Sequence, residues 1–119
     1  MRVIGPDLVF QRPSGFVLQG EWYDAKVSAL KFRTWDLVAG WQPPVGWKFF
    51  ARYAKQDMRI PATANPLSWD TDQLSLSAVQ PLRKALWLQY EYEINGEKPP
   101  AGIGKVKNNI FFIELFTGF

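Results

Sequence analysis

The sequence predicts an all-β fold, and two observations carry that prediction. Apolar and polar residues alternate over most of the chain, the period-two pattern of strands with one buried face. Clusters of Gly, Pro, Asn and Ser interrupt the alternation about every 8–12 residues, as turns do between short strands. We therefore expect one domain, residues 1–119, folded as an antiparallel β-sandwich or small barrel of about eight or nine short strands.

The expected strands follow from this alternation. They cover residues 7–11, 16–23, 29–35, 47–53, 56–60, 74–77, 87–94, 102–106 and 109–116. Residues 36–46 contain two Gly and two Pro and are expected to connect strands. Asn95-Gly96 predicts a tight turn, because both central positions of such a hairpin favour a positive φ, and Pro99-Pro100 equally predicts a longer loop.

One short helix is expected near residues 78–86. Val79, Leu82 and Leu86 recur at helical spacing, and Ser77 is a suitable N-cap. Pro81 would lie in the first turn, where its missing N–H does little harm.

The composition argues against several classes of function. The chain has no Cys and no His, so it lacks thiolate nucleophiles, zinc–thiolate ligands and the commonest general base. We therefore expect no enzymatic activity, no catalytic residue, no cofactor and no metal site. The 14 basic and 11 acidic residues give a net charge of +3, spread along the sequence without the clustering typical of a nucleic-acid binder. Binding of nucleic acid is therefore only a third interpretation.

Localisation is inferred from two further features. No apolar segment reaches the roughly 18–20 residues of a membrane-spanning helix, so no membrane partner is expected. The first residues lack the charged and then apolar layout of a signal peptide, which predicts synthesis in the cytoplasm.

Tryptophans mark one candidate interface. Trp35, Trp41 and Trp47 follow one another at intervals of six residues around the Gly/Pro-rich segment. Trp35 and Trp47 fall in expected strands and are assigned to the core. Two interpretations of Trp41 stay open. It is either a core residue or an exposed ring that anchors a protein partner or stacks on a sugar.

The C-terminal segment is a second candidate interface, since it is too apolar for a solvated edge strand. It must be covered on both faces or pair with a neighbouring subunit. The candidate interface residues are Trp41, Phe111, Phe112, Phe116 and Phe119.

The order of these elements resembles the small β-sandwich of phage tail and baseplate proteins, like the N-terminal domain of siphophage upper baseplate proteins. The resemblance rests on the strand 7–10, the turn 12–15, the strand 16–22, the glycine step 37–40, the strand 47–53, the acidic loop 69–72, the strand 74–77, the segment 78–86, the Tyr-x-Tyr-x-Ile strand 90–94 and the segment 102–107. It implies a non-enzymatic virion component, made in the host cytoplasm and held by symmetric contacts with other phage structural proteins.

These observations together predict a structural assembly protein that binds neighbouring protein subunits. The alternative is a carbohydrate-binding module that recognises a host-surface glycan through Trp41 and neighbouring rings.

Overall fold

The chain folds into eight β-strands in the computed structural model, which describes residues 2–60, 67–99, 104 and 106–118. The strands are β1 (Arg2–Ile4), β2 (Asp7–Gln11), β3 (Phe16–Val27), β4 (Leu30–Trp41), β5 (Lys48–Ile60), β6 (Leu67–Arg83), β7 (Leu86–Lys98) and β8 (Val106–Thr117). All neighbouring strands are antiparallel. The prediction of an antiparallel all-β fold is therefore confirmed.

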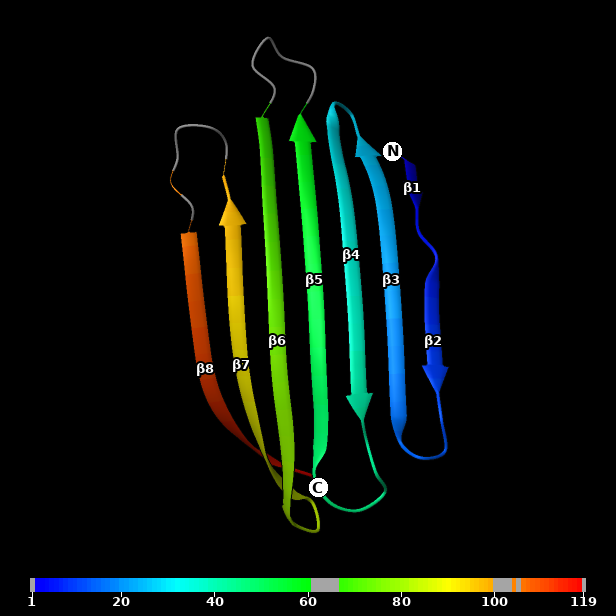
Figure 1. Ribbon diagram of the computed structural model, residues 1–119, viewed down its shortest axis with the longest axis vertical. Helices are drawn as coiled ribbons and strands as arrows, with labels where there is room; N and C mark the ends of the chain where they lie inside the picture. Colours follow the sequence, from blue (N-terminus) through cyan, green and yellow to red (C-terminus); the bar gives the residue numbers. More distant parts are fainter. Residues whose placement is uncertain (1, 61–66, 100–103, 105, 119) are drawn as a thin grey trace.

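The strands form one open sheet that follows the order of the chain. Its order is β1-β3-β4-β5-β6-β7-β8, and β2 continues the edge begun by β1, because both pair with β3. Figure 1 shows the single layer, with β1 and β2 at one edge and β8 at the other. The described residues form neither the second layer of the expected sandwich nor a closed sheet.

The strands are longer than expected because segments with turn-forming residues continue them. Residues 36–41, expected in a connection, extend β4 to Trp41. Gly40 lies in this strand beside Phe50, and a Cβ atom at Gly40 would come within 2.5 Å of the Phe50 ring. This glycine therefore makes room for a neighbouring ring and does not break the strand.

The expected helix near residues 78–86 is wrong. Residues 78–83 complete β6, and β7 begins at Leu86 after a two-residue turn. Pro81 is tolerated because β5 ends its pairing with β6 at Val79, so no donor is needed from Pro81 on that side. A register shift between Pro81 and Arg83 absorbs the irregularity on the β7 side.

One more expected turn is also strand. Asn95 and Gly96 lie within β7, opposite Asn108 and Lys107 of β8. The sheet ladder on both sides of β7 overrides the local turn preference of the Asn-Gly pair. The strand expected over 102–106 lies mostly outside the described residues.

The sheet has no closed apolar core. Among the described residues no hydrophobic side chain is fully buried. The Cα radius of gyration is 18.3 Å, against about 13.5 Å for a compact domain of this length. One sheet face therefore holds apolar side chains that no other part of the described chain covers.

Two glycines in turns make a matched test of backbone geometry. Gly15 has a φ of 94°, and a Cβ atom there would lie 2.4 Å from the Gln42 carbonyl oxygen. Gly46 has a φ of 99° and open space around it. We expect Gly46→Ala to cost about 1 kcal/mol of unfolding free energy from strain alone, and Gly15→Ala to cost clearly more. Urea titration measures both, and equal losses would contradict the close approach at Gly15.

Candidate functional site

The strand register divides the side chains between two faces of opposite character. Residues paired across an antiparallel ladder point to the same side, so the pairs Trp22–Trp35, Leu37–Tyr53 and Leu76–Tyr92 share one face. We call this side the apolar face and the other side the polar face.

The apolar face carries a continuous apolar band. It consists of every second residue of Phe16–Trp22 in β3, Trp35–Trp41 in β4, Phe49–Tyr53 in β5, Leu74–Ala78 in β6, Leu88–Ile94 in β7 and Phe111–Leu115 in β8, with Leu8 and Phe10 of β2. Trp35, Leu37 and Trp41 are each 50% exposed. The band is therefore a large exposed apolar surface.

Aromatic rings lie at both margins of the band on β3 to β5. Trp22, Trp35 and Tyr53 mark one margin. The other margin is the register row Phe16, Trp41 and Phe49, in which Trp41 stacks on Phe49 at 6.5 Å. Small and aliphatic residues fill the centre between the margins, namely Leu18, Gly20, Leu37, Ala39 and Ala51.

The Trp22 ring shows how a margin is built. It packs against Trp35 with ring centroids 5.9 Å apart, and its indole Nε1 has no hydrogen-bond partner among the described residues. This N–H is buried and therefore does not reach solvent, although a buried indole N–H usually finds a hydrogen-bond partner.

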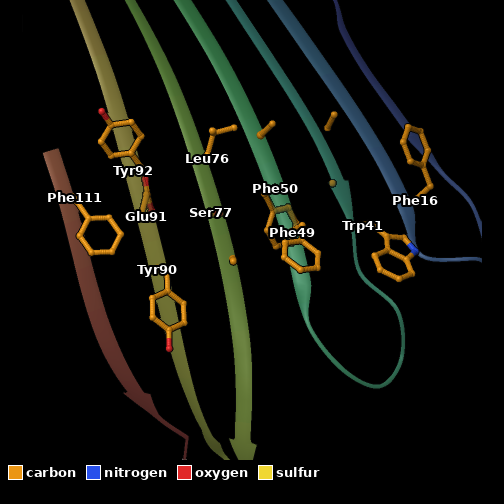
Figure 2. A pocket seen from close by; sticks show the side chains of 14 residues that line it. Phe16, Trp41, Phe49, Phe50, Leu76, Ser77, Tyr90, Glu91, Tyr92 and Phe111 are labelled. Carbon is orange, nitrogen blue, oxygen red and sulfur yellow. The ribbon is translucent and has the colours of Figure 1, made fainter. Parts of the chain in front are cut away.

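The band contains an open hollow of about 520 Å³. Ala39 and Ala51 are register partners whose small side chains lower its floor. Figure 2 shows rings around it from separate strands, among them Trp41 of β4 and Phe111 of β8. The structure thus brings two of the predicted interface residues to one surface, and Phe111 is 60% exposed.

The other predicted interface residues lie elsewhere. Phe112 and Phe116 alternate with Phe111 and therefore lie on the polar face, half-buried. Phe116 stacks on Trp87 with ring centroids 5.8 Å apart. Phe119 lies outside the described residues. Phe112 and Phe116 therefore do not share a face with Trp41 and Phe111, because a strand sends successive side chains to opposite faces.

The core assignment of two tryptophans is also wrong. Trp35 is half exposed in the apolar band, and Trp47 is exposed in the connection just before β5. Trp47 stacks on Phe49 and on Tyr90, at 6.2 and 6.0 Å between centroids. It therefore joins rings of the band from outside the sheet.

The polar face holds paired charges and hydrogen-bonded side chains. Arg52 Nε lies 3.1 and 3.0 Å from the two carboxylate oxygens of Asp36, and the guanidinium Nη2 donates to the same carboxylate. This hydrogen bonding raises the pKa of Arg52 above its ordinary value. On β3 the Tyr23 hydroxyl donates to Glu21 at 2.7 Å, which raises the pKa of the Tyr23 phenol.

The modest net charge hides a separation between the faces. Strand positions on the polar face hold the acids Asp7, Glu21, Asp36, Glu91, Glu93, Glu97 and Glu114, but only two bases, Lys48 and Arg52. Strand positions on the apolar face, beyond the Trp22 and Trp35 margin of the band, hold Asp24, Asp57, Asp70 and Asp72 with Arg2, Lys26, Lys31, Arg33, Lys55, Arg59, Lys98 and Lys107. The polar face is thus acidic, and the margin beyond the band is basic.

Sequence reasoning missed most of the band. Phe16, Phe49 and Tyr90 were assigned only to strands, with no partner beyond the core. The signal that could have revealed the band is a run of four apolar residues at every second position, bounded by aromatic rings. Such a run extends from Trp35 to Trp41 in β4.

No protein-family model matches the chain, and neither a curated protein nor a solved structure matches it. The described part of the chain has no helix of the length and apolarity required to cross a membrane. Among residues 2–60, 67–99 and 106–118, no three acidic side chains gather as a metal site would need.

The Tyr23–Glu21 contact gives a prediction for the polar face. The negative charge of Glu21 opposes ionisation of the phenol, so Glu21→Gln should lower the pKa of Tyr23 toward its ordinary value. A pH titration of phenolate absorbance measures the shift. Glu91→Gln is the control, since it removes an acid of the same face that is not in contact with Tyr23. An unchanged titration curve in Glu21→Gln would contradict the hydrogen bond.

Proposed function

We propose, in place of the expectation that the chain has no membrane partner, that it is a non-enzymatic structural protein whose apolar band contacts the hydrocarbon of a lipid bilayer while its polar face contacts water. The observation that carries the proposal is the layout of the band on β3 to β5, with aromatic margins around an aliphatic centre. Aromatic residues concentrate at membrane–water interfaces, and aliphatic residues concentrate between them. From Trp35 to Trp41 the band measures about 20 Å along the strand, and the rings at both ends extend it toward the roughly 25 Å of a lipid-facing sheet.

The inclination of the band supports the same environment. Its centre lies at Val38 on β4, and the register row of Val38 reaches β8 at Ile110. The centre of the band on β8 is Ile113, three residues further along (113 − 110). The centre of the band therefore shifts by about 10 Å along the strands over four strand spacings, which is about 19 Å. This shift corresponds to a tilt of the strands by roughly 30° from the direction perpendicular to the band. Strands that cross a bilayer are tilted by about 35–45°.

Exposed edges tie the proposal to assembly. Within a bilayer each unpaired backbone N–H or C=O costs several kcal/mol, so the free sides of β8 and of β1 and β2 require further strands. We therefore keep the proposal that the chain binds neighbouring subunits, and these subunits would bind at the sheet edges.

A second candidate is that a neighbouring protein subunit covers the apolar band, as in the expected phage tail or baseplate particle. The area supports it. The chain exposes 8807 Å², against roughly 6,600 Å² for a compact monomer of 13.7 kDa, an excess of roughly 2,200 Å². Obligate protein interfaces bury about 2,000–5,000 Å² over both partners. The second layer of a sandwich would then come from that subunit.

Sugar binding is supported less well. The stacked rings of Trp41, Phe49 and Trp47 offer a platform for a sugar. However, the hollow beside them is lined almost entirely by apolar groups, and a glycan site needs polar groups that bind the hydroxyls.

Fluorescence quenching by brominated acyl chains separates the first two candidates. In single-tryptophan variants folded with vesicles, we expect quenching of Trp35 and Trp41, which lie on the apolar face. Trp69 and Trp87 lie on the polar face and are the matched controls, expected to be quenched little. Equal quenching of all four, or none, would contradict a lipid-facing band. A stable oligomer in buffer with both band tryptophans shielded would favour the protein partner.

Adjacent residues of β4 test the same assignment energetically. Leu37 lies in the centre of the apolar band, and Val38 lies on the polar face. Leu37→Lys should weaken folding into vesicles by about 2–4 kcal/mol, because its charge meets hydrocarbon. Val38→Lys, with the same added charge, should have a small effect. Equal losses of folding free energy for the two variants, measured by titration of folding into vesicles, would contradict the contact between the apolar band and lipid.

A further inference from the structure

Four basic residues occupy one register row on the apolar face, beyond the band. Arg2 pairs with Lys26, Lys26 with Lys31, and Lys31 with Arg59, across β1, β3, β4 and β5. We call these four residues the basic row. All four side chains are exposed.

The basic row is unfavourable for the sheet by itself. Like charges directly opposite each other on neighbouring strands destabilise the pairing. Two nearby acids of the same face already serve other bases, since Asp24 pairs with Arg33 at 3.5 Å and Asp57 pairs with Lys55 at 3.6 Å. Among the described residues no carboxylate lies within ion-pair distance of the basic row. An external anion would relieve this repulsion.

The location of the basic row indicates which kind of anion it binds. On β3 the Trp22 ring at the margin of the band precedes Lys26 by four residues, about 13 Å along the strand. On β4 Trp35 and Lys31 have the same separation. In a bilayer whose hydrocarbon ends at the aromatic margin, these flexible side chains reach the phosphate groups of the lipids.

We propose that the basic row binds the phosphate groups of anionic lipids at one surface of the bilayer. The inference rests on the proposed lipid-facing band and names which headgroups, at which end of the strands, contact the protein. The opposite margin, at Phe16 and Trp41, has no comparable row among the described strand positions. The sheet therefore has a preferred orientation toward an anionic surface.

The test compares binding to phosphatidylcholine vesicles with and without phosphatidylglycerol, by sedimentation with the vesicles. The full chain should prefer the anionic vesicles. Lys31→Gln should lower that preference about fivefold, and Lys26→Gln with Lys31→Gln should lower it further. Lys48→Gln removes an exposed lysine from the polar face and is the matched control, whereas Lys31→Arg should keep the preference.

Each other outcome has a definite meaning. If Lys31→Gln and Lys48→Gln retain the same anionic preference, the inference is overturned, although quenching of Trp35 and Trp41 would still support the lipid-facing band. If inorganic phosphate stabilises the lipid-free chain against heat and Lys31→Gln abolishes this, the row binds free phosphate and the lipid assignment fails. Lys31→Gln should fold at least as stably as the unaltered chain without anions, since it relieves repulsion.

Discussion

The backbone hydrogen-bond ladder is the constraint on which the rest of the structure depends. Strands β3 to β7 are paired on both sides, while no side chain among the described residues forms a buried apolar core. The register of this ladder decides which face each side chain joins, and a slip of one residue would exchange the faces. Leu37 would then leave the apolar band and Asp36 would enter it. The contrast between the faces therefore fixes the register, and the register in turn creates the band.

The alternation of residues predicted the strands well, because side-chain period is a local property. It misjudged where strands end, since Gly40, Pro81 and Asn95-Gly96 are tolerated through contacts with neighbouring strands that a local pattern does not contain. The number of layers was not predictable either. Alternation shows which residues share a face but not what covers that face. Trp41 and Phe111 were found as bulky apolar residues, whereas the run of apolar residues concealed that Phe112 lies on the opposite face from Phe111.

The separation of charge between the faces gives the near-neutral composition a different meaning. Acids and bases alternate along the sequence with little clustering, yet pairing across strands collects most acids on the polar face and most bases beyond the apolar band. Pairs such as Asp36–Arg52 then neutralise part of the acidic face. The sheet thus separates three environments, an acidic wet face, an apolar band and a basic margin, within one layer of backbone.

The direction of the two edge strands has a consequence for any larger structure. Seven strand positions alternate in direction across the sheet, so β2 and β8 run the same way at opposite edges (Figure 1). Copies joined edge to edge in one orientation would bring β8 beside β1 and β2 as parallel neighbours. A two-fold pair through β8 would be antiparallel but would turn the basic row of one copy to the opposite end. Copies can also be joined by antiparallel pairing at both edges with all basic rows at the same end. An odd number of further strands must then lie between β8 of one copy and β1 and β2 of the next.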